Sequence, residues 1–559
     1  MKINLSINNI RNCFQPVQLE NHKPVIREYV AGIVILLILG IRLFYPLQQY
    51  MDIQFADEAA YMRFGLDLFE KLNRDWGPVY TIWYKLLSYI TDDPIQLYYL
   101  NYKIAGIVVP VLFFILLLRI RIVPLLALFI SICFLYSNIN VTVWPRISNF
   151  CMILFLSSVI LVTFQRNYIP RFVTMIFCCL ICSYARPEFY LSFVAVVFLL
   201  FVYLAFNRKT TGRKEWMLLG VTLLFIGVLH YIFRFPSNNF FGFNRGVAAF
   251  YQHYAFNYKM RTKTPGIAWL FWEDLAKNTF GDCNSMWCVI KTQPVIVLKN
   301  TLYNIQHYIV YTWVYVSSFI IPSFLAKSNK KALFATVILL ALLIFSFAKK
   351  ERRQVVWAYI RNNLFLFIFL FVFCIPTFAS CIMVYPRTHY ILLQAGLTLT
   401  LLAVILNSCI RSIKPNTLFM LVLLPLFILL PSGLKNYTFL LTEGEKPGSF
   451  CNTKTVEVLR KEYADKPYTI FTPMPFVSGM LHENFSEVNS VFDKKKDTAF
   501  AYYLDTRKIN ILLITPAIDK DPHLLHDTTW INFIKDPSSA GFIRKPLCDD
   551  KHYLLVKEN

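Results

Sequence analysis

Two adjacent acids, Asp57 and Glu58, follow the first long apolar run of the chain, residues 29–46. That run can cross a bilayer, so the acids would emerge roughly two or three helical turns beyond the far membrane face. A carboxylate there, kept ionised by nearby cations, can accept the proton of an attacking hydroxyl. Asp57 is therefore a candidate general base, although either acid would also suit the first turn of a surface helix. Adjacent helical residues point about 100° apart, so Glu58 cannot face the same cavity equally well.

Cationic side chains that could bind an anion lie at the ends of other apolar runs. Arg146 and Arg186 occupy such positions, and the segment that contains Arg387 and His389 shares their membrane face. By the alternation of basic and less basic links these ends face away from the cytoplasm, which runs against the positive-inside rule. Binding of a phosphate would explain the arginines. The alternatives are snorkelling to lipid phosphate and an internal ion pair between Arg186 and Glu188.

The segment after the two acids is amphipathic. A helical pattern runs through Tyr61, breaks at Gly77-Pro78, and resumes in an aromatic run that contains Tyr80 and Lys85. We expect two helices lying on the membrane surface, with Tyr61 and Tyr80 available to orient a substrate. Lys85 is a further candidate phosphate ligand, or a lysine that touches bulk lipid.

Composition identifies the chain as a polytopic membrane protein. Of its 559 residues 56% are hydrophobic and 17% aromatic, and the mean hydropathy is +0.48. The net charge of +23 does not indicate a nucleic-acid partner, because the basic residues gather in short links between apolar runs. That distribution fits positive-inside topology and contact with anionic membrane lipids.

The apolar runs predict eleven spans. After residues 29–46 they lie at 103–118, 122–137, 149–164, 172–186, 188–206, 217–233, 332–348, 361–384, 389–410 and 416–434. The stretch 303–326 is more polar and aromatic, and counting it would place the basic residues 349–353 outside, so we interpret it as interfacial or re-entrant. Residues 1–28 lack a cleavage site and form a cytoplasmic tail. The odd count then places loops 50–102 and 234–300 and the C-terminus outside the cytoplasm, in an inner (plasma) membrane protein.

A different composition begins near residue 443. Over 443–559 helix-like runs (455–463, 498–506 and 529–534) alternate with strand-like runs (468–472, 510–515 and 552–556), which predicts a soluble α/β domain with a partly parallel sheet. It lacks a Gly-rich phosphate loop, a set of Cys and His residues at metal-ligand spacing and a nucleophile elbow, so we assign it no catalysis. Outside the cytoplasm Cys451 could pair with Cys548 and Cys283 with Cys288, the alternative for the latter pair being two buried thiols. The cysteines inside apolar runs are expected to be small core residues.

A family resemblance rests on these residues. The first span, the acids followed by Tyr61, the Gly77-Pro78 break before an aromatic helix, and the many-spanning body resemble the GT-C superfamily of integral-membrane glycosyltransferases. The most similar branch contains protein O-mannosyltransferases and lipid A aminoarabinose transferases. The similarity covers residues 28–435, a GT-C-like transmembrane domain, and is most specific over 52–102. The chain departs from the family pattern where Gly77-Pro78 replaces Pro-Pro, and where Tyr390 follows Arg387 by three residues instead of directly.

The resemblance implies transfer of a sugar from a polyprenyl-phosphate donor to an extracytoplasmic acceptor, which would be a protein, a lipid or a glycan. It implies inversion at the anomeric carbon, with Asp57 as the base and Glu58 beside it. Arg387, helped by Arg146 or Arg186, would bind the departing phosphate, and His389 could share its oxygens. Apart from the resemblance, Glu188 is a second acid on this face that could orient the substrate or help Asp57 to hold a divalent metal, and no other cofactor is expected.

Two other classes of function are compatible with charges around a lipid-accessible cavity. A flippase or transporter of lipid-linked saccharides should show charged or Gly/Pro-broken sites near the middle of the membrane, and often related halves. The chain instead gathers its charges at one face and shows no internal repeat. A polymerase or ligase of surface polysaccharide would use a large loop with Arg and His rather than acids after the first span.

Overall fold

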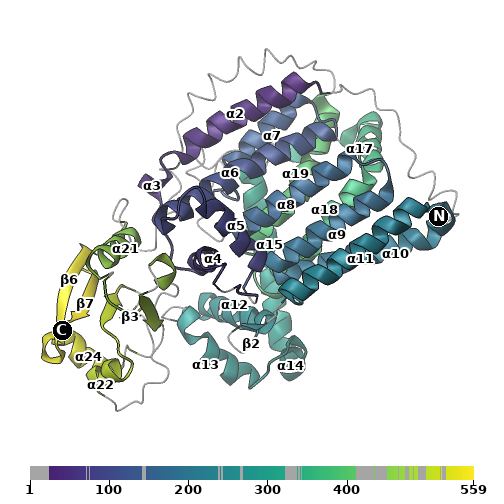
Figure 1. Ribbon diagram of the computed structural model, residues 1–559. Helices are drawn as coiled ribbons and strands as arrows, with labels where there is room; N and C mark the ends of the chain where they lie inside the picture. The colour runs from purple at the N-terminus through teal and green to yellow at the C-terminus, as the bar shows by residue number, and fades with distance from the viewer. Residues whose placement is uncertain are drawn as a thin grey trace.

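The computed structural model describes residues 24–558 with interruptions, the longest being 321–336, 411–433, 435–449 and 489–498. Within the described residues the fold is a large helical bundle with a small C-terminal domain built on a sheet (Figure 1). The predicted helical body with apolar helices and the C-terminal segment that combines helices with a sheet are therefore both present.

Long apolar helices form the bundle. In the described part of the chain, eight helical segments are long and apolar enough to cross a membrane. Each carries a nearly unbroken series of apolar residues, and in lipid such a segment must satisfy its backbone hydrogen bonds within the helix. They are α2 with α3 (Ile26–Phe44 and Leu47–Tyr50), α6 (Pro94–Arg119), α8 (Ile147–Phe164), α9 (Tyr168–Ala185), η1 with α10 (Pro187–Phe189 and Tyr190–Asn207), α11 (Arg213–Phe233), α18 (Leu364–Met383) and α19 (Thr388–Ile410).

The predicted count of eleven spans is not reached in the described residues. The run 122–137 forms α7 (Pro124–Leu135), whose twelve residues are fewer than the roughly 20 that a full crossing needs. The runs 332–348 and 416–434 lie largely outside the described residues. Of the stretch 303–326, interpreted as interfacial, residues 303–320 belong to a continuous helix, α15 (Pro294–Ile320), and 321–326 lie outside the described residues. Helix α15 packs beside α18 and is not among the apolar candidate spans.

Small residues allow the first helix to approach its neighbour closely. A Cβ atom at Gly32 of α2 would lie 2.1 Å from the Phe114 ring of α6, and one at Gly106 of α6 would lie 2.5 Å from the Phe44 ring of α2. Helices in membranes gain little from hydrophobic burial against one another, so close van der Waals packing of this kind holds them together. It also fixes the end of α2 from which the two acids emerge.

One end of the bundle carries the shorter elements. Here lie α4 (Asp57–Leu66) and α5 (Pro78–Ser88), which pack on each other and on α6, and α12 (Arg245–Thr262), α13 (Ala268–Phe280) and α14 (Met286–Thr292) (Figure 1). A two-stranded ribbon, β1 (Asn239–Phe240) with β2 (Phe243–Asn244), precedes α12. The two predicted helices after the acids are thus present, although the first ends at Leu66.

The C-terminal domain contains a five-stranded mixed sheet in the order β4-β3-β5-β7-β6. Strand β3 is parallel to both β4 and β5, whereas β7 is antiparallel to β5 and β6. The partly parallel sheet is confirmed, although strands β4 and β6 were not predicted. The elements are α21 (Cys451–Glu462), β3 (Tyr468–Phe471), η5 (Ser478–Met480), β4 (Phe485–Val488), α22 (Phe500–Thr506), β5 (Ile511–Ile514), α24 (Thr528–Lys535), η7 (Pro537–Ala540), β6 (Phe542–Asp549) and β7 (His552–Lys557).

This domain is fastened to the loop that leads into α4. The buried carboxylate of Asp52 accepts hydrogen bonds from the backbone N–H groups of Asn452 and Thr453 at 2.8 and 3.0 Å, at the N-terminus of α21. A carboxylate in that place satisfies free amides and favours the helix dipole. Arg460 of α21 also pairs with Asp93 at 2.7 Å. The domain is therefore anchored beside the two acids.

Both disulfides that the sequence left open are present, Cys283–Cys288 and Cys451–Cys548. The alternative of two buried thiols for the first pair is thereby wrong. Among the described residues seven other cysteines, all in apolar helices, are free and buried as expected: Cys133, Cys151, Cys178, Cys179, Cys182, Cys374 and Cys381. The side chain of Cys409 lies outside the described residues.

Candidate functional site

Asp57 and Glu58 begin α4, and the fold gives them different surroundings. Asp57 is partly exposed, whereas Glu58 is 1% exposed. Glu58 accepts hydrogen bonds on Oε1 from the hydroxyls of Tyr80 and Tyr84 and, at 2.9 Å, from the side-chain amide of Asn101. Its Oε2 accepts the backbone N–H of Arg146 at 2.9 Å. Through these hydrogen bonds Glu58 connects α4 to α5, α6 and the start of α8, so its role is structural.

Arg146 is part of the same buried framework. Its guanidinium donates to the carbonyl oxygen of Asn140 at 2.8 Å and to Asn149 Oδ1 at 3.3 Å, and it stacks over the Tyr102 ring with 3.2 Å from Cζ to the ring centroid. With 2% of its surface exposed, it is occupied by protein partners. The structure therefore brings Arg146 close to Glu58 but does not turn its guanidinium toward Asp57.

Asp57 faces three arginines that come from separate parts of the chain. Arg245, Arg387 and Arg186 all lie close enough to interact electrostatically with its carboxylate. Among the described residues, its own backbone N–H is the one hydrogen-bond donor to that carboxylate. Burial raises the pKa of Asp57, and the three guanidinium groups oppose the rise. Asp57 is thus a partly exposed carboxylate surrounded by cations, and its oxygens can still accept further hydrogen bonds.

Arg186 is held in place at the junction of α9 and η1. It donates to Glu188 Oε1 from Nε at 2.6 Å and to Ser148 Oγ at 2.5 Å, and its guanidinium lies 4.9 Å from the Tyr390 ring centroid. The internal pair between Arg186 and Glu188 considered from the sequence is therefore present. It neutralises one of the three cations around Asp57.

Arg245 is the site residue that sequence reasoning missed. It begins α12, beside Trp76 at 5.4 Å from Cζ to the ring centroid, and interacts with the Tyr61 hydroxyl. One terminal nitrogen of its guanidinium is buried and has no hydrogen-bond partner. A cation in the first turn of a helix is disfavoured by the helix dipole. In the sequence, Asn244-Arg245-Gly246 places an arginine at the start of a helical pattern. This unfavourable position is the signal that could have identified Arg245 as a site residue.

Arg387 borders an open cavity of about 380 Å³. Its lining comes from α15 and from the segment that leads into α19: Tyr311, Tyr315, Tyr385, Pro386, Arg387, Thr388 and His389. The guanidinium lies 5.3 Å from the Trp269 ring centroid of α13, and burial lowers its pKa, which is too high for the charge to be lost. The predicted neighbours Arg387 and His389 are thus brought to one cavity.

His253 of α12 lies near Arg387 and His389. Its Nδ1 bonds to the Ala249 carbonyl oxygen at 2.6 Å, so Nδ1 must carry the hydrogen. Burial and the charge of Arg387 hold the pKa of His253 well below its usual range. Its buried Nε2 is left as an acceptor without a partner. A neutral imidazole of this kind can accept a hydrogen bond from a hydroxyl.

Tyr61 and Tyr80, which were expected to orient a substrate, pack against each other next to the two acids. The rings of Tyr61 and Tyr80 are 5.2 Å apart, and only Tyr61 contacts the arginine cluster, since Tyr80 donates to Glu58. Burial raises the pKa of Tyr61 to about 12. Lys85 lies elsewhere: its Nζ donates to the Leu66 carbonyl oxygen at 3.3 Å and sits 4.9 Å from the Phe69 ring centroid.

Gly77 has a backbone conformation that the proline of the GT-C pattern could not adopt. Its φ of +56° is inaccessible to proline, whose φ is fixed near −65°. A Cβ atom there would lie 2.6 Å from Tyr61 Cε1 and 3.1 Å from the Ala185 carbonyl oxygen. The turn therefore requires glycine, and it lets α5 begin directly against the site.

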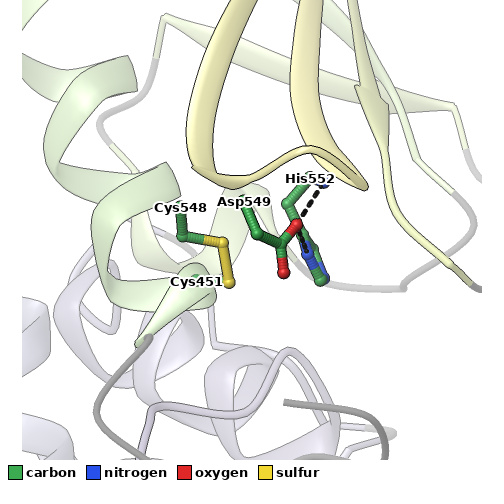
Figure 2. A group of neighbouring side chains, drawn as sticks. All are labelled: Cys451, Cys548, Asp549 and His552. Carbon is green, nitrogen blue, oxygen red and sulfur yellow. Dashed lines mark hydrogen bonds and ion pairs between the residues drawn. A yellow bond between two sulfur atoms is a disulfide. The ribbon is translucent and has the colours of Figure 1, made fainter. Parts of the chain in front are cut away.

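The expected metal pair, Asp57 and Glu188, gains no third carboxylate, imidazole or thiol ligand among the described residues. The single group of three or more such ligands in that part of the chain lies in the C-terminal domain, at Cys451, Cys548, Asp549 and His552 (Figure 2). The site around Asp57 instead offers guanidinium groups, which suits an anion better than a cation.

The site as a whole can hold an anion next to a proton acceptor. Three guanidinium groups, Arg186, Arg245 and Arg387, face two carboxylates, Asp57 and Glu188, so the cluster is net positive. An added phosphate would neutralise that excess and engage the unpartnered nitrogen of Arg245. A hydroxyl placed beside it could donate its proton to Asp57. Comparison with known proteins adds nothing to this geometry, because no protein-family model matches the chain and no curated protein matches it significantly.

Proposed function

We propose that the protein is a membrane glycosyltransferase that moves a sugar from a polyprenyl-phosphate donor to an acceptor hydroxyl. The observation that carries the proposal is the convergence of Arg186, Arg245 and Arg387 on a partly exposed Asp57. Phosphate is the anion that arginine clusters bind best, and a carboxylate beside it is the proton acceptor that attack by a hydroxyl requires. The GT-C resemblance of residues 52–102 points to the same chemistry.

The reaction is a direct displacement. The acceptor hydroxyl gives its proton to the Asp57 carboxylate while its oxygen forms the new bond to the anomeric carbon. The bond from that carbon to the phosphate oxygen breaks, and the polyprenyl phosphate leaves with one more negative charge. Attack opposite the leaving group inverts the anomeric configuration.

The arginines act where that charge develops. Arg245 and Arg387 carry positive charges that no ion pair within the described residues neutralises at close range, whereas Arg186 is paired with Glu188. Electrostatic stabilisation in a partly buried site is stronger than in water and requires no reorganisation at the moment of reaction. The unpartnered Nε2 of His253 lies beside Arg387 and could orient a sugar or acceptor hydroxyl.

The place of the site suits a donor with a lipid tail. Arg186 lies between two apolar candidate spans and Arg387 directly precedes another. A polyprenyl chain could therefore remain in the bilayer while its phosphate reaches the arginines. We place this end of the bundle outside the cytoplasm, as the distribution of basic links indicates. The acceptor remains a protein, a lipid or a glycan.

The test uses purified full-length protein in lipid nanodiscs, supplied with radiolabelled polyprenyl-phosphate monosaccharides and envelope acceptors. We expect transfer by the wild type and a loss of at least 100-fold in Asp57→Asn with donor binding retained, the range in which general bases contribute. Glu70→Gln, which changes an exposed acid on the same loop, is the matched control and should leave transfer unchanged.

Two results would overturn the proposal in different ways. Undiminished transfer by Asp57→Asn would remove the carboxylate from the mechanism. Absence of transfer from every donor, together with movement of a labelled lipid-linked saccharide across proteoliposomes, would favour the transporter class instead.

A further inference from the structure

The C-terminal domain brings four side chains of metal-binding type to one point. Cys451 begins α21, Cys548 lies near the end of β6, and Asp549 and His552 flank the turn between β6 and β7. One ligand atom from each of the four lies within 4.8 Å of all the others. Figure 2 shows the cystine sulfurs beside the Asp549 carboxylate and the His552 ring.

From this cluster we propose that reduced Cys451 and Cys548, together with Asp549 and His552, bind one zinc ion. Two thiolates, an imidazole and a carboxylate are zinc ligands, and a structural zinc site takes four of them in a tetrahedron. At Zn–S distances near 2.3 Å and Zn–N and Zn–O distances near 2.0–2.2 Å, such ligands lie roughly 3–4 Å from one another. To reach that arrangement the two sulfurs, which are bonded in the disulfide, must separate to about 3–4 Å, and the other ligand atoms start no more than 4.8 Å apart.

The local backbone already fixes these ligands. Asp549 Oδ1 accepts the backbone N–H groups of Lys551 and His552, each at 2.8 Å, and contacts His552 Nδ1 at 2.8 Å. This turn leaves Asp549 Oδ2 without a donor among the described residues. Asp549 is 43% exposed at its side chain and His552 11%, so an ion can enter from solvent.

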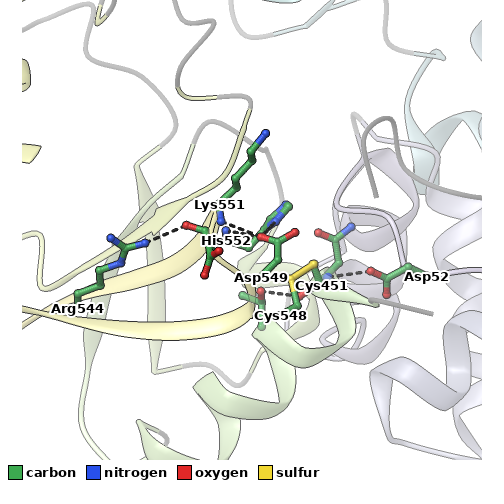
Figure 3. A network of polar contacts seen from close by, with 10 residues as sticks. Asp52, Cys451, Arg544, Cys548, Asp549, Lys551 and His552 are labelled. Carbon is green, nitrogen blue, oxygen red and sulfur yellow. Dashed lines mark hydrogen bonds and ion pairs between the residues drawn. A yellow bond between two sulfur atoms is a disulfide. The ribbon is translucent and has the colours of Figure 1, made fainter. Parts of the chain in front are cut away.

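Cys451 is fixed from the opposite side. It is 1% exposed, and the two residues after it are bound by Asp52 from the membrane domain, as Figure 3 shows for the network around Asp52, Cys451 and the β6–β7 turn. The Cα atoms of Cys451 and Cys548 are 5.3 Å apart. A thiolate pair on one metal ion can keep that spacing, so zinc would replace the disulfide as a link between α21 and β6.

The disulfide and the metal exclude each other because zinc takes thiolates. A dithiol reductant gives two electrons and two protons to the cystine, its S–S bond breaks, and the reductant becomes a disulfide. Zinc then displaces the two thiol protons. The domain therefore has one linkage for oxidising surroundings and another for reducing ones.

The experiment uses the full chain in nanodiscs, in a Cys283→Ser/Cys288→Ser background that removes the other reducible pair. After reduction with a phosphine and addition of zinc chloride, desalted protein should retain about one zinc per chain more than the untreated disulfide form. Cobalt in place of zinc should give the near-ultraviolet absorption of thiolate ligation.

Matched variants decide between this site and adventitious binding. His552→Ala and Asp549→Asn, which leave both thiols in place, should each weaken zinc binding by roughly tenfold or more. His526→Ala, at an exposed histidine of the same domain, should not. Equal zinc retention by the reduced and disulfide forms would overturn the proposal, as would affinities for His552→Ala and Asp549→Asn equal to that of His526→Ala.

Discussion

Replacing Glu58 should destabilise the protein, whereas replacing the adjacent Asp57 should not. Glu58 accepts four buried hydrogen bonds, from Tyr80, Tyr84, Asn101 and the backbone of Arg146. A buried donor left unpaired costs about 1–3 kcal/mol. The Asn101 amide already contacts both tyrosine hydroxyls, at 2.8 and 2.9 Å, so part of the network can close again. We therefore expect a loss of about 3–5 kcal/mol for Glu58→Ala, a large effect for one substitution.

The conservative substitution isolates one contact. In Glu58→Gln the amide oxygen can keep the contacts at Oε1, while the amide nitrogen faces the Arg146 N–H and cannot accept from it. The expected loss is about 1–3 kcal/mol. Asp57→Asn breaks no hydrogen bond from another described residue. Because burial raises the pKa of Asp57, this carboxyl costs folding stability as the pH rises from its ordinary pKa to the raised value, and the cost is fully present above that value. Asn removes the cost.

The assay is the apparent unfolding temperature of each variant in one detergent at neutral pH, followed by the fraction that stays monodisperse after heating. The expected order is Asp57→Asn at or above the wild type, then Glu58→Gln, then Glu58→Ala. Because such unfolding is irreversible, the ranking is the measured quantity rather than an equilibrium free energy. The reasoning fails if Glu58→Ala is as stable as the wild type, or if Asp57→Asn is as unstable as Glu58→Ala.

Three further predictions follow from the same geometry. Transfer should fall as the pH drops through the raised pKa of Asp57. Arg245→Gln removes one cation that lowers this pKa, so it should move the acid limb of the pH–rate profile to higher pH. An unchanged acid limb would show that Arg245 does not influence the pKa of Asp57. Gly77→Ala should cost about 2–3 kcal/mol and reduce activity, because alanine disfavours the positive φ and its Cβ would meet the Tyr61 ring; unchanged thermal stability would contradict this. Asp52→Ala should cost about 2 kcal/mol and speed hydrogen exchange of the first amides of α21, and unaltered exchange would show that the cap is not needed.

The sequence was sufficient for the parts of the fold that depend on local pattern. Long apolar runs specify membrane helices through composition alone, and alternating short runs specified α21, β3, β5 and β7. The sequence did not predict strand β6, because Arg544, Lys545 and Pro546 interrupt its apolar residues. Pairing with β7 makes this segment a strand. The run 122–137 forms only the twelve-residue α7, because the helix begins at Pro124 and hydropathy does not report where a helix begins.

The site was predictable in its residue types but not in its partners. Arg186 was singled out because a cation at that helix end conflicts with the charge rule for membranes, and Arg387 because its segment resembles the GT-C pattern. That rule cannot separate an arginine that faces a cavity from Arg146, which the fold uses internally. Glu58 and Asp57 are neighbours in sequence, and only the packing of α5 and α6 against one side of α4 gives them unlike surroundings.

The C-terminal domain contributes no catalytic residue to the site, but it packs against α4, the helix that carries Asp57. A Cβ atom at Gly479 of η5 would lie 2.7 Å from the carbonyl oxygen of Ala59, two residues after Asp57. Arg63 of the same helix donates to the Leu481 carbonyl oxygen at 3.2 Å. A ten-residue helix is only marginally stable by itself, so α4 depends on packing from both sides. The bundle holds α4 through the hydrogen bonds of Glu58, and the C-terminal domain holds it through Gly479 and the bond from Arg63 to Leu481. Both sets of contacts keep the Asp57 carboxylate close to Arg186, Arg245 and Arg387.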